Sequence, residues 1–329
     1  MTDQTFDAFI VKKTADKQYA GRVEQIRVRD LPEGEVLIRV KYSSLNYKDA
    51  LSATGNKGVT RTYPHTPGID AAGHVEESRV SKLAPGDPVI VTSYDLGMNT
   101  AGGFGQYIRV PANWVVPLPG GLTLEESMIL GTAGFTAAMS VEKISNIPVD
   151  AGPILVTGAT GGVGSMAVAI LARIGYAVTA VSGKHETGFL NDLGASEIIS
   201  RQTFVEDIKP PVLPAKWAAV VDTVGGDILA TAVKSTKAWG KVTCCGLVAS
   251  PDLPLTVFPF ILRGVSLHGI DSQHYPKEPR QALWKKLAHD WKPQNLAEMA
   301  TRITLDQLPT AIDNMLKGRL KGRTIINMG

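Results

Sequence analysis

The sequence predicts an α/β protein in two parts: a doubly wound parallel sheet, preceded by a partly barrel-like, mostly-β domain. Three features of its 329 residues indicate this. Short stretches of alternating polar and apolar residues reach to about Pro119, and strand and helix patterns alternate from Pro153 onward. An apolar run at 154–157 ends in a cluster of glycines before a helical pattern begins. Such a turn points backbone N–H groups at a phosphate, so a nucleotide site is expected there.

The mostly-β domain is predicted from four stretches separated by turn signals: EVLIRVKYSSL, GHVEESRV, DPVIVTSY and FGQYIRVP. Thr123 and Glu126 have the spacing of a capping box, which opens a helix and places the domain boundary near residue 125. A last strand, RTIINM, is expected to return to the first domain. Residues 1–125 and 300–329 are therefore predicted to form the substrate domain, and 126–299 the cofactor domain.

The cofactor domain is predicted from continuous apolar strands with helical stretches between them. The strands are ILVTG, YAVTAVS, AAVVDTVG and GKVTCCGL. Strands that are apolar throughout belong to parallel sheets covered by helices on both faces.

Composition excludes several classes of protein. The net charge is only +3, which argues against nucleic acid or an anionic membrane surface as a partner. No run approaches the ~18 apolar residues of a membrane span, and the first residues lack a signal-peptide pattern. A cytoplasmic protein is expected. The only cysteines, Cys244 and Cys245, are neighbours, so we expect two buried thiols rather than disulfides or a metal site.

The glycine cluster carries the prediction of a dinucleotide site. Ala159 replaces the first glycine of a GxGxxG pattern, and the later two remain. The pattern follows a strand and opens a helix, as such a site requires; a purely structural tight turn is the alternative. The residues expected to contact the cofactor here are Thr160, Gly161, Gly162, Val163 and Gly164.

The end of the second strand decides which dinucleotide is expected. An Asp or Glu at that point would bind the adenosine ribose of NADH, but the sequence reads Val181, Ser182, Gly183, Lys184. Ser182 and Gly183 could donate to a 2′-phosphate, and Lys184 and Arg201 could pair with it, so NADPH is predicted. The alternative is that Lys184 merely solvates a loop and Arg201 a strand end.

The chain resembles the medium-chain dehydrogenase/reductase superfamily, and within it the quinone-oxidoreductase-like branch that includes acrylyl-CoA reductases. The resemblance covers nearly the whole length and rests on motifs in order, among them SSLNYKDAL at 43–51, PGIDAAGHV at 67–75, GTAGFTAA at 131–138, VTGATGGVGS at 156–165, DTVGG at 222–226 and GRTI at 322–325. It implies a Rossmann-type cofactor domain, a GroES-like catalytic domain, and a homodimer formed through the sheet edge of the cofactor domain.

The zinc ligands of related alcohol dehydrogenases are missing from the matching positions. Asn46 and the Gly68-Ile69-Asp70 run stand where a Cys and a Gly-His-Glu are found in those enzymes, and residues 93–105 contain no cysteine. Without such ligands zinc cannot be held, so a metal-free enzyme is expected. His65 and His74 are expected to be hydrogen-bonded structural groups.

An enzyme without a Lewis acid is suited to conjugated alkenes. Hydride added at the β-carbon spreads negative charge into an enolate, which the Asn46 amide, the Tyr47 hydroxyl or backbone N–H groups could stabilise. The Tyr47 hydroxyl could also supply the proton. Alternatively Tyr47 only packs on the nicotinamide and water supplies the proton. Lys48 and Asp49 could orient the substrate, but a solvated or intramolecular ion pair is expected for both, and a turn or cap role is expected for Asp70.

The resemblance adds further cofactor contacts. It implies that Leu247, Ile261 and Ser272 lie near the nicotinamide, and that Arg323 binds the pyrophosphate. Core packing is the alternative for Leu247 and Ile261.

The expected function is an NADPH-dependent reductase of activated C=C bonds, most of all an enoyl thioester of the acrylyl-CoA type. Reduction of an enone or a quinone is the alternative within enzymes. A non-catalytic NADPH-binding protein with a regulatory or structural role is the alternative from another class.

Overall fold

The structure is a computed structural model that describes residues 4–184, 188–206 and 209–329. The chain divides into two compact units. The first comprises residues up to Thr132 with Gln273–Ala288 and Leu296–Gly329, and the second comprises Ala133–Ser272 with His289–Asn295. The units differ from the predicted domains over 126–132, 273–288 and 296–299.

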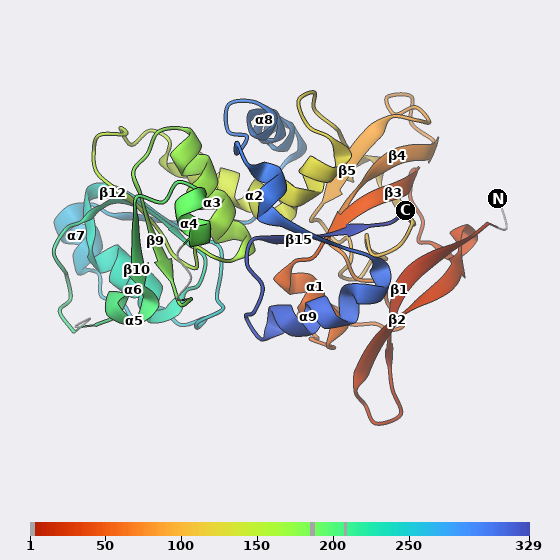
Figure 1. The fold of residues 1–329 in the computed structure, drawn as a ribbon, viewed down its shortest axis with the longest axis horizontal. Coiled ribbons are helices and arrows are strands. Elements are labelled where there is room, and N and C mark those ends of the chain that lie inside the picture. Colours follow the sequence, from red (N-terminus) through yellow and green to blue (C-terminus); the bar gives the residue numbers. More distant parts are fainter. Residues whose placement is uncertain (1–3, 185–187, 207–208) are drawn as a thin grey trace. The chain divides into compact units, whose positions relative to one another are not determined.

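The first unit is built on a seven-stranded sheet with the order β14-β15-β3-β4-β5-β7, in which β6 also pairs with β3 (Figure 1). All these pairs are antiparallel except β14 with β15. A separate antiparallel hairpin is formed by β1 and β2. The strands are β1 Thr5–Lys13, β2 Tyr19–Arg27, β3 Val36–Ser44, β4 Asp70–Ser78, β5 Pro88–Thr92, β6 Tyr107–Val110, β7 Val116–Pro117, β14 Ala300–Ile303 and β15 Arg323–Asn327.

Short helices complete this unit. They are α1 Tyr47–Ala53, α8 Lys277–Ala288 and α9 Leu308–Leu316, with 3₁₀ turns at Val28–Asp30, Ala112–Trp114, Leu296–Met299 and Leu305–Gln307. The last strand returns to the first unit as predicted, because β15 pairs with β3 from Ile325 opposite Ser44 to Asn327 opposite Tyr42.

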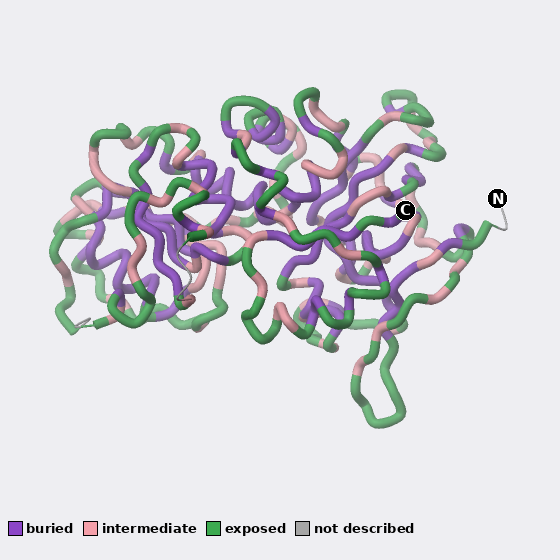
Figure 2. The backbone as a smooth tube through the Cα atoms, in the orientation of Figure 1, coloured by how far each residue is buried: buried purple, intermediate pink, exposed green. Residues whose placement is uncertain are grey.

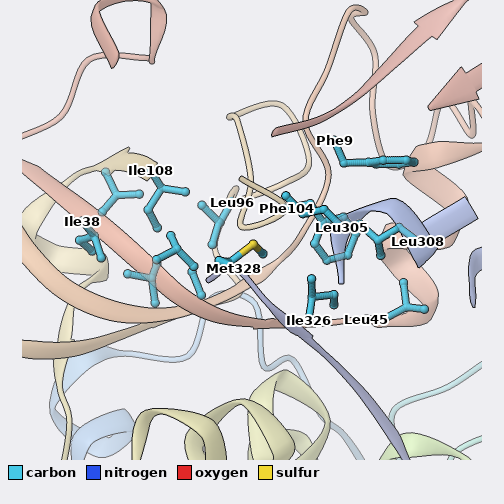
Figure 3. Packing of buried hydrophobic residues seen from close by; sticks show 14 of the residues in the cluster. Phe9, Ile38, Leu45, Leu96, Phe104, Ile108, Leu305, Leu308, Ile326 and Met328 are labelled. Carbon is cyan, nitrogen blue, oxygen red and sulfur yellow. The ribbon is translucent and has the colours of Figure 1, made fainter. Parts of the chain in front are cut away.

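The core of the first unit joins residues that are far apart in the chain. Leu45, just before α1, packs in one cluster with Phe104, Leu308 of α9 and Ile326 of β15 (Figure 3). All four side chains are almost entirely buried. Burying a large apolar side chain contributes about 1.5–3 kcal/mol, so this cluster fixes the start of α1 against the carboxyl-terminal segment.

The second unit is the doubly wound sheet that was predicted. Its order is β10-β9-β8-β11-β12-β13 and every pair is parallel. The chain enters at β8, winds outward to β10 on one side and then to β13 on the other. The central strands are buried along their length (Figure 2). The elements are β8 Ile154–Val156, β9 Val178–Ser182, β10 Glu197–Ser200, β11 Trp217–Asp222, β12 Thr236–Cys244, β13 Ser266–Gly269, α3 Gly162–Arg173, α4 Gly188–Asp192, α5 Arg201–Phe204, α6 Gly226–Lys234 and α7 Phe258–Arg263.

Helix α2, Leu124–Ile144, begins with the predicted capping box and is kinked in its middle. Thr123 N donates to Glu126 Oε2 at 2.9 Å, and Glu126 N donates to Thr123 Oγ1 at 3.1 Å. At Gly131 the backbone leaves the helical region, with φ 51° and ψ −158°, a conformation open essentially only to glycine. The kink lies one residue from the end of the first unit.

Within the described ranges, none of the helices combines the length and the apolar character needed to cross a membrane.

Candidate functional site

The predicted site residues fall into two groups, one in each compact unit. The glycine loop and the residues after β9 lie in the second unit, together with Leu247, Ile261 and Ser272. Asn46, Tyr47 and Arg323 lie in the first.

The glycine loop connects β8 to α3 at the point where the strand order reverses, between β8 and β11. A Cβ on Gly164 would collide with the Gly158 carbonyl oxygen, so close packing of the loop against the helix requires glycine there. Helix α3 starts at Gly162, and its N-cap residue, Gly161, provides no side-chain hydrogen bond to the first turn. An uncapped helix N-terminus beside a loop of small residues fits a pyrophosphate.

Asp222, at the end of β11, braces this loop. It accepts a hydrogen bond from Thr157 Oγ1 at 2.7 Å and another from Gly225 N at 2.9 Å. Its side chain is fully buried, and burial raises the pKa of its carboxyl group. The brace joins the ends of the two central strands. No role was predicted for Asp222 from the sequence, where the run DTVGG supported only the family resemblance.

Three of the residues predicted for a 2′-phosphate lie at the end of β9, and the fourth, Arg201, follows the neighbouring strand β10. Lys184 N donates to Ser182 Oγ at 3.0 Å, and a Cβ built on Gly183 would lie 2.9 Å from Cζ of Arg201. The Arg201 guanidinium is therefore packed over Gly183. Two cationic residues, a hydroxyl and a glycine at the ends of two neighbouring strands fit a phosphate that carries two negative charges.

Leu247 and Ile261 are exposed by 65% and 69%, which excludes the core-packing alternative for both. Ser272 Oγ accepts a hydrogen bond from Thr136 Oγ1 at 2.9 Å. Contacts between these three residues and a nicotinamide stay predictions.

Asp70 is the centre of a buried polar cluster in the first unit, a larger role than the predicted turn or cap. Its carboxylate accepts hydrogen bonds from Ser44 Oγ at 2.6 Å, Asn46 Nδ2 at 2.8 Å and Thr132 Oγ1 at 2.6 Å. Arg323 NH2 lies 3.9 Å from its Oδ2. Buried charges require such partners, since a lone one is strongly destabilising.

Arg323 directs its guanidinium into the protein. It donates to Ile129 O at 3.0 Å, Asn46 Oδ1 at 3.2 Å and Ser44 Oγ at 2.9 Å, and it is only 3% exposed. These hydrogen bonds give the arginine a structural role, and its pyrophosphate contact stays a prediction.

The Asp70 and Arg323 side chains also form hydrogen bonds with backbone groups at the kink of α2. Thr132 N donates to Asp70 Oδ2 at 2.9 Å, and Ile129 O accepts from Arg323. Both are backbone groups beside the break at Gly131, where the helix cannot pair them regularly. A Cβ on Gly131 would lie 2.6 Å from Asp70 Oδ2 and from Ser44 Oγ, so the cluster leaves room only for glycine.

Asn46 and Tyr47 take different positions. The Asn46 amide nitrogen donates to Asp70 and to Ser44 O at 3.3 Å, and the residue is 8% exposed. Both of its N–H donors are thus engaged, and its predicted contact with an enolate stays untested. Tyr47 is the first residue of α1 and is 41% exposed. Its hydroxyl makes no hydrogen bond with the part of the chain that the structure describes.

Asp49 lies beside Asp70 and caps α1. It accepts hydrogen bonds from Asn46 N and from Ile69 N, both at 2.8 Å, and is fully buried. Burial, together with the nearby Asp70 charge, raises the pKa of Asp49 to about 7. Its sequence neighbour Lys48 donates to Gln273 Oε1 at 2.8 Å.

His65 is a hydrogen-bonded structural group, as predicted, because its Nε2 lies 2.9 Å from Gly97 O and the residue is 8% exposed. In the described ranges, no three side chains of His, Cys, Asp or Glu gather as metal ligands would. Independence from metal stays a prediction.

The buried Asp49 predicts a pH dependence of stability. The folded protein holds the Asp49 proton more tightly than the unfolded chain, whose carboxyl titrates near pH 4. Protonated Asp49 therefore contributes its full share to the free energy of unfolding below pH 4. As the pH rises to about 7 this contribution is lost, and the free energy of unfolding falls by about 4 kcal/mol. Asp49→Asn removes this contribution. Urea unfolding between pH 4 and 8 should show the variant and the wild type diverging with pH.

The exposed Asp16→Asn serves as the matched control for that series. Curves for Asp49→Asn that run parallel to the wild type across the whole range would contradict the assignment.

Comparison with known proteins places both units in one family. The family model "Alcohol dehydrogenase GroES-like domain" matches residues 32–120, and the model "Zinc-binding dehydrogenase" matches residues 162–289. A protein of Bacillus subtilis, "Putative quinone oxidoreductase YhfP", is 43% identical, covering 98% of this chain and 99% of that protein. "Acrylyl-CoA reductase AcuI" of Ruegeria pomeroyi is 42% identical with the same coverage.

Two solved structures share the fold over nearly the whole chain. The yhdH oxidoreductase from Salmonella enterica, in complex with NADP, has a TM-score of 0.95 at 40% identity and covers 98% of this chain and 100% of that one. Bacillus subtilis yhfP with NAD bound has a TM-score of 0.95 at 42% identity, and the match covers 98% of this chain and 99% of that one. The chain therefore belongs to the medium-chain dehydrogenase/reductase superfamily, in its quinone-oxidoreductase-like branch.

Proposed function

We propose that the protein is an NADPH-dependent reductase of activated C=C bonds, acting on an enoyl thioester of the acrylyl-CoA type. The observation that carries the proposal is the exposed Tyr47 at the start of α1, directly after Asn46, whose amide is held by the buried Asp70. A relative that is 42% identical over 98% of this chain is named an acrylyl-CoA reductase, which supports the substrate class.

The second unit would hold the cofactor by its phosphates. Backbone N–H groups from Thr160 to Gly164 would bind the pyrophosphate. Ser182 and Gly183 would donate to the 2′-phosphate, and Lys184 and Arg201 would pair with it. The bound nicotinamide would supply a hydride to the β-carbon of the substrate. The structure with NADP and 40% identity supports this choice of cofactor, although the yhfP structure holds NAD.

The first unit would stabilise the charge that develops on the substrate. The Tyr47 hydroxyl would donate to the thioester oxygen as it gains enolate character, or to the α-carbon. Asn46 precedes Tyr47 directly, and Asp49, Asp70 and Arg323 hold its backbone and side chain. Asn46 would therefore orient the start of α1 rather than contact the substrate.

Quinone reduction is the second candidate function. The relative that is 43% identical over 98% of this chain is named a putative quinone oxidoreductase. A quinone also accepts hydride without a Lewis acid, since the charge spreads over its ring and oxygens.

A homodimer is part of the proposal. Strand β13 ends the parallel sheet, with β12 as its neighbour in the sheet order of the described residues. Exposed apolar side chains lie in the same unit, where Trp239 is 80% exposed and Leu262 64%. Exposed strand edges and apolar patches favour association with a second copy. Sedimentation equilibrium measures the assembly directly.

A substrate panel tests the function. Stopped-flow oxidation of NADPH should be fast with acrylyl-CoA, slower with crotonyl-CoA and a small enone, and slowest with a benzoquinone. A reversed order would favour quinone reduction. Absence of turnover with every substrate would leave a non-catalytic NADPH-binding protein. A parallel series with a chelator tests independence from metal.

Lys184→Ala tests the cofactor assignment. Loss of a cation from the 2′-phosphate should weaken NADPH binding by about tenfold while NADH binding stays nearly unchanged. Fluorescence titration with each nucleotide measures both constants. Lys216→Ala, an exposed lysine of the same unit, is the control. Equal weakening for the two nucleotides would refute the phosphate contact.

Tyr47→Phe tests the chemical step. If the hydroxyl donates to the enolate, turnover of acrylyl-CoA should fall about tenfold or more, because one donor to a developing charge is lost. The affinity for NADPH should remain that of the wild type, which shows that the fold is intact. An unchanged turnover would reduce Tyr47 to a packing role.

A further inference from the structure

The segment between α1 and β4 exposes positive charge only. From Asn46 to Ile69 the chain has three cations, Lys48, Lys57 and Arg61, and a single acid, Asp49. Asp49 is fully buried, whereas Lys57 and Arg61 are both exposed. The surface of residues 54–63, called the basic turn below, is therefore cationic.

The basic turn is anchored to α1 by buried and half-buried hydrogen bonds. Ser52 Oγ and Thr60 Oγ1 lie 2.7 Å apart, and Thr60 is fully buried. Tyr63 Oη donates to Ser52 O at 2.6 Å, and Asn56 O accepts from the backbone N of Thr60 at 3.0 Å. The two cations therefore stand on a fixed base rather than a loose loop, which reduces the entropy lost when they bind a ligand.

Lys57 and Arg61 both keep N–H donors that could bind a ligand. Lys57 Nζ donates to Arg61 O at 3.1 Å and lies 5.7 Å from the centre of the Tyr63 ring, which uses part of its donor capacity. The Arg61 guanidinium makes no hydrogen bond or ion pair with any residue in the described ranges. A lysine and an arginine held close by one backbone contact, with no carboxylate between them, suit phosphate oxygens.

The basic turn lies one short helix away from Tyr47. Helix α1 has seven residues, from Tyr47 to Ala53, and therefore rises by about 10 Å. In an acyl-CoA, the reacting thioester and the phosphates are separated by the pantetheine arm, which is longer than this when extended. A thioester at Tyr47 could thus place its phosphates on the turn.

We propose that the basic turn binds the phosphates of the CoA moiety of the substrate, through Lys57 and Arg61. This rests on the proposed function and makes it more specific, since an uncharged quinone or enone has no group for this turn. The turn would select thioesters of CoA over small activated alkenes by lowering their KM.

The experiment compares Lys57→Ala/Arg61→Ala with Arg79→Ala/Lys82→Ala. The control pair removes one arginine and one lysine, both exposed, from the turn between β4 and β5 of the same unit. Each protein is assayed with acrylyl-CoA and with acrylyl-pantetheine, which carries the same thioester without phosphates. KM and kcat are measured at two ionic strengths, and the KM for NADPH is measured alongside.

The basic-turn variant should raise the KM for acrylyl-CoA about tenfold with kcat retained, and leave the KM for acrylyl-pantetheine unchanged. Added salt should raise the wild-type KM for acrylyl-CoA more than that of the variant. The control pair should leave every constant as it was.

Three results would overturn the inference: an unchanged KM for acrylyl-CoA, an equal rise for acrylyl-pantetheine, or a rise in the KM for NADPH instead, which would assign the turn to the nucleotide. A wild-type enzyme that reduces neither thioester would overturn the proposed function itself, which is a separate outcome.

Discussion

The first unit depends on one buried pair of opposite charges, Asp70 and Arg323, each of which compensates the other. Asp70 and Arg323 are almost entirely inaccessible, and each would be strongly destabilising alone. Together they close the kink of α2 at Gly131 and fix the Asn46 side chain that precedes α1. The exposure of Tyr47 follows from this arrangement, because its neighbours in sequence are held inward while it begins the helix on the outside.

The elements set by local patterns could be predicted from the sequence. The capping box at Thr123 and the glycine turn after β8 are confirmed, since each depends on residues close in sequence or on a continuous apolar pattern. The expected return of the last strand to the first unit is confirmed as well. The Asp70 cluster could not be predicted in the same way. Its members are separated by up to about 280 residues, and a lone Asp or Arg in a strand carries no sign of its partner.

The same limit applies to the predicted roles of single residues. Residue type left both cofactor contact and core packing open for Leu247 and Ile261, because side-chain chemistry does not reveal which face of a loop or helix meets solvent. The structure shows that both are exposed. For Ser182, Gly183, Lys184 and Arg201 the prediction of a common position was better founded. Parallel strands end at one edge of a sheet, so the residues that follow them lie close together.

The place of β15 in its sheet bears on how the chain is made. This strand lies between β14 and β3, so the sheet of the first unit joins segments from both ends of the described chain. The doubly wound sheet, by contrast, uses residues 154–269 alone. During synthesis all strands of the doubly wound sheet have been translated before the ribosome adds residue 323. Strand β3 can therefore pair with β15 only after the whole doubly wound sheet has been translated.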